Sequence, residues 1–173
     1  MKILITGGAG FIGNNLVRNL LLTTNHEIIN LDKLGYASDL TSINSLDEKS
    51  LSRYKFMKVD LNDFLKLKEA IFFTNPDRII NLAAESHVDR SIDNPNLFLQ
   101  SNVIGTFNLL EVVRDLFNTI SDTKKQNFIF HHISTDEVFG SLGKKGKFNE
   151  STKYDPRSPY SASKACSDHL VNA

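Results

Sequence analysis

Cysteine is nearly absent from this sequence. Cys166 is the only one among 173 residues, so no internal disulfide can form, and nothing points to an oxidising compartment. Charge of one sign is not in excess either: 20 basic and 20 acidic residues balance, without the polyelectrolyte signature of proteins that bind nucleic acids or anionic membranes. No apolar run approaches the length of a transmembrane helix, and the chain begins with a strand-like segment instead of a signal peptide. We therefore expect a cytoplasmic protein with no nucleic-acid or membrane partner.

Metal-ligand spacing is missing as well. His26, His87 and His169 are not spaced as in metal sites. His131 and His132 are adjacent on a predicted strand, so their side chains should face opposite sides of a sheet. We expect no metal site.

A glycine-rich turn is the clearest feature at the start of the chain. Residues 2–6 form a short apolar run typical of a buried parallel strand. The run GGAGFIG follows at once, with Gly7, Gly10 and Gly13 spaced as in a dinucleotide-binding turn, and apolar residues at helical spacing continue to Leu22. Glycines let a backbone approach a pyrophosphate, and the helix N-terminus offers it free N–H groups. A turn used only for tight packing is the alternative, but strand, turn and helix together favour nucleotide binding.

An acidic residue follows the second predicted strand. Asp32 comes directly after Glu27–Leu31, where its carboxylate can accept from a ribose 2′-hydroxyl and would repel a 2′-phosphate. The sequence therefore predicts NAD as the cofactor in preference to NADP. The neighbouring Lys33 leaves strict exclusion of NADP open.

Two short runs near the end of the chain carry candidate catalytic groups. Tyr160 and Lys164 are one helical turn apart and share a helix face. An adjacent cation lowers the pKa of a phenol, so this pair could take a proton from an alcohol while a hydride leaves the same carbon. Thr135 precedes Asp136 and Glu137, which add a second acid/base pair and suggest a further proton transfer, such as loss of water. The alternatives are an exposed helix that begins with a tyrosine, and a polar loop after a strand.

Strands and helices alternate along the chain. The predicted strands are Ile3–Thr6, Glu27–Leu31, Tyr54–Val59, Arg78–Ala83 and Asn127–Ser134. The predicted helices are Ile12–Leu22, Asn62–Phe73, Asn96–Phe117 and Pro159–Val171. This alternation predicts one α/β domain over residues 1–173, a Rossmann-type doubly wound parallel sheet with five strands in the order 3-2-1-4-5. Motifs that follow strands should then meet at the carboxyl edge of the sheet, where such folds bind ligands.

The predicted helix Asn96–Phe117 is apolar on two sides. We expect one set of its residues to face the sheet: Val103, Phe107, Leu110 and Val113. A second set is left over: Leu99, Leu109, Val112 and Leu116. A partner subunit, or a further part of the same chain, could cover this second side. The last strand would also be left as an apolar edge, which predicts that the chain stops early.

Five stretches in this order resemble one known family: ITGGAGFIG, DKLGYA, AAESHVDRSI, STDEV and SPYSASKA. The chain is similar to the N-terminal half of the dTDP-glucose 4,6-dehydratases, which are extended short-chain dehydrogenases/reductases. Members of that family are longer, and their C-terminal part makes most contacts to the nucleotide of the sugar substrate. The resemblance therefore implies that the C-terminal substrate domain is absent here and that this chain is inactive alone. It also implies a homodimer through the helices Asn96–Phe117 and Pro159–Val171.

The resemblance implies a set of cofactor contacts. These are Gly7, Gly10, Phe11, Ile12 and Gly13 at the pyrophosphate; Asp32, Lys33, Leu34 and Gly35 at the adenosine ribose; Asp60 and Leu61 at the adenine; and Leu82, Ala83, Ala84, Ser86, Tyr160 and Lys164 around the nicotinamide half. Ser101 keeps a hydroxyl where the family usually has threonine, and Ser86 would also lie near the sugar.

The resemblance also implies a reaction in three steps. NAD takes a hydride from sugar C4 while Tyr160 takes the hydroxyl proton, and Thr135 hydrogen-bonds the 4-hydroxyl. Glu137 then removes the C5 proton while Asp136 protonates the departing C6 hydroxyl, and the hydride returns to C6. Phe139 departs from the family pattern, which commonly has tyrosine there. A nucleotide-sugar 4-epimerase would share most of these residues but would not need Asp136 and Glu137, and a non-catalytic NAD-binding fragment is a further alternative.

Overall fold

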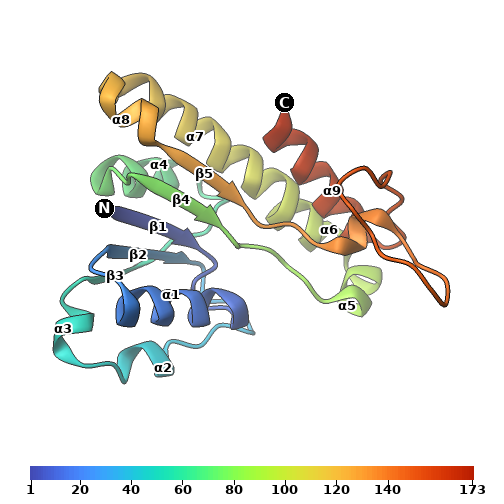
Figure 1. Ribbon diagram of the computed structural model, residues 1–173, viewed down its shortest axis with the longest axis horizontal. Coiled ribbons are helices and arrows are strands. Elements are labelled where there is room, and N and C mark those ends of the chain that lie inside the picture. The colour runs from blue at the N-terminus through green and yellow to red at the C-terminus, as the bar shows by residue number, and fades with distance from the viewer.

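Five short strands form the centre of the molecule (Figure 1). The computed structural model describes residues 1–173. Its strands are β1 (Lys2–Thr6), β2 (Glu27–Asp32), β3 (Tyr54–Lys58), β4 (Arg78–Asn81) and β5 (Ile129–His132). They pair in parallel in the order β3-β2-β1-β4-β5, which confirms the expected sheet.

Helices cover both faces of this sheet (Figure 1). One face carries α1 (Phe11–Thr23), α2 (Thr41–Asn44) and α3 (Glu48–Leu51). The other side of the molecule carries α4 (Phe64–Thr74), α7 (Gly105–Thr119), α8 (Asp122–Asn127) and α9 (Pro159–Asn172). Two short helices, α5 (Val88–Asp93) and α6 (Pro95–Phe98), lie toward the carboxyl ends of the strands. None of the helices combines the length and the hydropathy that a membrane crossing requires.

The strands are buried on both faces because their side chains alternate. Ile3 and Ile5 of β1 point into a cluster with Val17 and Leu21 of α1. Leu4, between them, points to the opposite face. There it joins a larger cluster with residues from α4 and α7, namely Leu67, Ala70, Ile71, Leu109, Val112, Val113 and Leu116.

The single helix expected over Asn96–Phe117 is interrupted. A π-helical segment, η1 (Leu99–Ile104), separates α6 from α7. A π turn holds more residues than an α turn and is frequent at functional sites. Here it turns the side chain of Asn102 into the protein, where only 1% of the residue is exposed.

The expectation about which side of this helix faces the sheet was wrong for most residues. Leu109, Val112 and Leu116, expected on the outer side, are buried in the core, while Phe107 is 45% exposed and Leu110 is only partly buried. Both sides are apolar, so spacing alone could not choose between them.

Strand ends and short helices also differ from expectation. β4 ends at Asn81 instead of Ala83, because the chain leaves the sheet there. The last strand loses residues at both ends, since Asp122–Asn127 forms α8 and Asp136–Phe139 forms a 3-10 helix, η2. The short helices α2, α3 and α5 were not expected, because segments of four to six residues hold too little periodicity to detect.

Substitution of adjacent leucines in α7 tests this packing. Leu109→Ala should lower the free energy of unfolding by about 2–5 kcal/mol, because it opens a cavity in the larger core. Leu110→Ala, the matched control on the same helix, should cost clearly less, because Leu110 is only partly buried. Urea denaturation of both variants measures the difference. A larger loss for Leu110→Ala would contradict the packing described above.

Candidate active site

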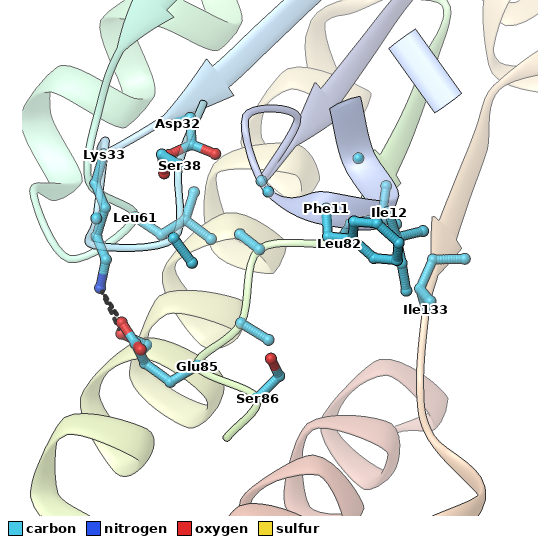
Figure 2. A pocket seen from close by; sticks show the side chains of 18 of the residues that line it. Phe11, Ile12, Asp32, Lys33, Ser38, Leu61, Leu82, Glu85, Ser86 and Ile133 are labelled. Carbon is cyan, nitrogen blue, oxygen red and sulfur yellow. Dashed lines mark hydrogen bonds and ion pairs between the residues drawn. The ribbon is translucent and has the colours of Figure 1, made fainter. Parts of the chain in front are cut away.

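The carboxyl ends of the strands open into one cavity of about 330 Å³. Small-molecule sites usually have volumes of about 300–1,000 Å³. The expected cofactor-binding residues that line it are Gly7, Gly10, Phe11, Ile12, Gly13, Asp32, Lys33, Gly35, Asp60, Leu61, Leu82, Ala83, Ala84, Ser86, Ser101, Tyr160 and Lys164. Figure 2 shows the side chains of Phe11, Ile12 and Leu82 on one side of this cavity and Asp32 and Lys33 on the other. Leu34 lies outside it, in an adjoining polar hollow.

Several lining residues were missed by reasoning from sequence: Leu31, Tyr36, Ala37, Ser38, Val59, Glu85, Ile133 and Ser134. Most of them are direct neighbours of expected residues in the chain. Their positions just after a predicted strand were the available signal.

The glycine turn is shaped by close backbone contacts. Gly7 has φ +70°, and a Cβ built there would lie 2.7 Å from backbone atoms of Ala83. A Cβ on Gly13 would clash with the carbonyl oxygen of Gly7. These two positions therefore require glycine, one for conformation and both for space.

The first turn of α1 suits an anion. Helix α1 begins at Phe11, its N-cap is Gly10, and no side chain caps its free N–H groups. Its first turn also carries no acidic residue. The N–H groups and the positive end of the helix dipole are thus available to a phosphate at the cavity wall.

Asp32 ties the turn to the following loop. One carboxylate oxygen, Oδ2, accepts from the backbone N–H of Ala9 at 3.0 Å. The other, Oδ1, accepts from the N–H of Leu34 at 2.8 Å and from the hydroxyl of Ser38 at 3.1 Å. Figure 2 shows the side chains of Asp32 and Ser38 at one end of the cavity. A carboxylate has about four acceptor positions, so Asp32 keeps capacity for a ligand hydroxyl.

Lys33 is bound across the cavity to a residue that sequence reasoning missed. Its Nζ donates to Glu85 Oε1 at 2.9 Å and to Ser101 Oγ at 3.0 Å (Figure 2). The pair joins the end of β2 to the segment after β4. It pairs the ammonium of Lys33, the residue that follows Asp32 in the chain, with a carboxylate.

Asn102 holds the backbone of the segment after β4. Its Oδ1 accepts from the N–H of Glu85 at 2.8 Å, and its Nδ2 donates to the Glu85 carbonyl at 2.9 Å and to Ser163 Oγ at 2.8 Å. The buried amide therefore holds β4's exit and helix α9 together. The role of Asn102 could not be predicted from the sequence, because its position depends on the π turn.

The helix that carries Tyr160 and Lys164 has a well-defined start. Ser158 caps α9 by accepting from the N–H of Ser161, whose side chain in turn binds the N-cap, and Pro159 occupies the first turn. This start places Tyr160 and Lys164 on the cavity wall, 8% and 4% exposed. Lys164 Nζ donates to the carbonyl of Ile133 at 2.7 Å.

The pKa of Tyr160 runs against the expectation. Burial raises the pKa of its phenol, the charges of Glu137 and Asp136 raise it further, and a hydrogen bond from Thr135 lowers it. Lys164 is not among the groups that shift the pKa of Tyr160. Burial lowers the pKa of Lys164 itself to about 8. Asp168 acts on Lys164 in the opposite direction and raises its pKa.

The other three candidate catalytic residues lie at the rim. Thr135 caps η2 by accepting from the N–H of Glu137 at 3.3 Å. Asp136 and Glu137 are exposed and do not line the cavity, but their charges reach Tyr160. A buried phenol and ammonium thus stand beside two solvated carboxylates, which is an arrangement for several proton transfers at one place.

A family model described as GDP-mannose 4,6 dehydratase matches residues 4–173. The chain belongs to this family. It is 50% identical over 173 residues to a probable dTDP-glucose 4,6-dehydratase of Sinorhizobium fredii, covering 100% of this chain and 49% of that protein.

Solved structures agree with the fold. A dTDP-glucose 4,6-dehydratase of Streptomyces venezuelae with NAD bound is 39% identical with a TM-score of 0.85, covering 98% of this chain and 50% of that one. A UDP-Glc/GlcNAc 4-epimerase of Campylobacter jejuni is 32% identical with a TM-score of 0.82, covering 99% and 48%. The chain spans about half the length of the relatives it matches. Fold similarity extends to both activities, so individual residues must distinguish them.

Replacing one glycine of this family's turn tests the close contacts. Gly13→Ala should abolish measurable nucleotide binding or unfold the chain, because its Cβ has no room against Gly7. Gly143→Ala is the control, since a Cβ there meets nothing within 4 Å. Thermal melts and calorimetric titration with NAD check both variants. Normal binding by Gly13→Ala would contradict the described turn.

Proposed function

We propose that this chain binds NAD in the cavity and forms the cofactor half of a dTDP-glucose 4,6-dehydratase. The observation that carries the proposal is the meeting of Asp136 and Glu137 with Tyr160 and Lys164 at one end of a cavity that begins at the glycine turn. The relatives named above support it, because they include dehydratases and an NAD-bound structure.

The cavity residues suggest how the cofactor would lie. The pyrophosphate would meet the uncapped N–H groups of α1, and the adenosine ribose would meet Asp32. The adenine would pack between apolar side chains such as Val59 and Leu61. The nicotinamide end would reach Ile133 and Tyr160.

When bound, NAD would supply the redox chemistry, taking a hydride from C4 of the sugar and returning it at C6. Tyr160 would take the proton of the 4-hydroxyl. Because burial raises the pKa of this phenol, it needs a positive charge nearby to act as a base, and Lys164 lines the same cavity one helical turn from Tyr160. Glu137 would then remove the C5 proton, and Asp136 would protonate the departing C6 hydroxyl, which leaves as water. When the hydride is returned at C6, Glu137 would give the proton back to C5. Both carboxylates stay at the rim, where a sugar placed over Tyr160 would meet them.

We also propose a homodimer through the expected helices, observed as α6 to α7 and α9. Leu99, Ile104 and Phe107 leave this surface apolar, since each is more than 40% exposed. Sedimentation at several concentrations tests the dimer, and a monomer throughout would exclude it.

Cofactor choice gives the first test. The wild-type chain should bind NAD at least about tenfold tighter than NADP, because Asp32 would repel a 2′-phosphate. Glu85→Gln should tighten NADP binding about fivefold, because it releases Lys33 from its ion pair. Glu111→Gln, which neutralises a carboxylate paired with Arg114 on α7 and away from the cavity, is the control and should leave both affinities unchanged. Equal binding of the two cofactors by the wild type would overturn the role given to Asp32.

The dehydration step gives the second test. It uses this chain continued by the second half of the Sinorhizobium relative, which should convert dTDP-glucose to the 4-keto-6-deoxy sugar. Glu137→Gln should slow product formation at least about a hundredfold while reduced cofactor accumulates on the enzyme. Tyr160→Phe should block the first oxidation, so that not even the absorbance of reduced cofactor appears. If Glu137→Gln turns over normally and the product is the C4 epimer, the epimerase activity replaces the dehydratase.

A further inference from the structure

A chain of polar side chains runs from the sheet to the back of α9. Thr6 donates from its hydroxyl to Asn81 Oδ1 at 2.5 Å, and Asn81 Nδ2 lies 3.1 Å from His132 Nδ1. An amide nitrogen only donates, so Nδ1 of His132 accepts. The neutral imidazole therefore carries its proton on Nε2.

His132 also lies close to Asp168. His132 Nε2 is 3.3 Å from Asp168 Oδ1, but the two buried atoms form no hydrogen bond with each other. The other carboxylate oxygen accepts from Ser134 Oγ at 2.5 Å and from the Tyr154 phenol at 2.9 Å. Burial alone would raise the pKa of Asp168, but these hydrogen bonds outweigh it and lower the pKa. Asp168 is thus held as a buried anion.

Asp168 and Lys164 hold the same short segment. They are one turn apart on one face of α9, the face that also carries Tyr160. Lys164 binds the carbonyl of Ile133, and Asp168 binds the hydroxyl of the next residue, Ser134. The two side chains of α9 therefore hold the segment after β5 and the ammonium of Lys164 in place together.

We propose that Asp168, held by the hydroxyls of Ser134 and Tyr154, is a positioning residue that keeps the buried Lys164 charged and anchored at the end of β5. A buried ammonium without a counter-charge is costly and tends to lose its proton. Through Lys164, Asp168 then supports the cofactor end of the cavity. This last clause rests on the proposed function; the effect on Lys164 does not.

Other ionisable groups surround this site. On the cavity side are Tyr160, Asp136 and Glu137, and on the far side are His132, Tyr154 and His169. The helices α5 and α7 also pack against α9 and carry Asp89, Arg90, Asp93, Glu111, Arg114 and Asp115. Of all these charges only that of Asp168 shifts the pKa of Lys164.

The test measures the Lys164 proton directly. Chains labelled with ¹³C at lysine Cε are titrated by NMR, with Lys164→Arg identifying the resonance. The wild-type lysine should titrate near pH 8, the value to which its burial lowers it. Asp168→Asn should lower this pKa by about one unit or more, because an opposite charge is removed. Asp122→Asn, which neutralises a carboxylate that is 95% exposed, is the matched control and should leave it unchanged. An unchanged Lys164 pKa in folded Asp168→Asn would overturn the proposal.

Two further readouts separate the outcomes. Asp168→Ser, a smaller neutral variant, should lower the pKa of Lys164 in the same direction, and an unchanged pKa there would overturn the proposal even if Asp168→Asn does not fold. Asp168→Asn should weaken NAD binding about tenfold at pH 8 and less at pH 6.5, where Lys164 is charged in both proteins. A shifted lysine with unchanged NAD affinity would overturn the positioning role. Failure of the wild type to bind NAD would instead refute the proposed function and leave the lysine titration intact.

Discussion

The contact between Gly7 and Ala83 holds the centre of the site together. β1 is the middle strand, and the chain leaves it at Gly7 while the neighbouring strand β4 leaves the sheet beside it. The backbone N–H of Ala83 donates to the Thr6 hydroxyl at 3.2 Å, and that of Gly7 donates to the Leu31 carbonyl at 2.8 Å. Because no Cβ fits between Gly7 and Ala83, the glycine turn and the segment after β4 form one continuous floor. The rest of the cavity is built around this floor.

Buried polar networks then fix the walls. Asn102 satisfies both backbone groups of Glu85, and Asp168 Oδ2 accepts from Ser134 and Tyr154 behind Lys164. Fully paired buried polar groups specify a single geometry, because any other arrangement leaves a costly unpaired atom. The two networks act on different ends of the cavity, but both include α9. This helix therefore couples the segment after β4 to the end of β5.

The sequence predicted the sheet order and most of the cavity lining, because alternating strands and helices leave few topologies, and a parallel sheet gathers the ends of its strands at one edge. It could not predict contacts made by tertiary packing. Glu85 and Asn102 are 17 residues apart and meet only through a π turn. The core-facing side of α7 stayed ambiguous because both sides are apolar. Spacing shows that Lys164 is near Tyr160, but not that burial of the phenol and the charges of Glu137 and Asp136 raise its pKa.

The site divides by solvent exposure as well as by residue type. Tyr160 and Lys164 are buried, so their proton affinities are set by desolvation and by a few neighbours, whereas Asp136 and Glu137 are solvated at the rim. The buried and the exposed groups respond to different influences: Lys164 responds to the charge of Asp168, Tyr160 responds to the charges of Glu137 and Asp136, and the two carboxylates respond to whatever covers the rim. In the proposed reaction the sugar itself would cover it. Binding would then desolvate the carboxylates at the moment their proton transfers begin, which strengthens their interaction with the sugar.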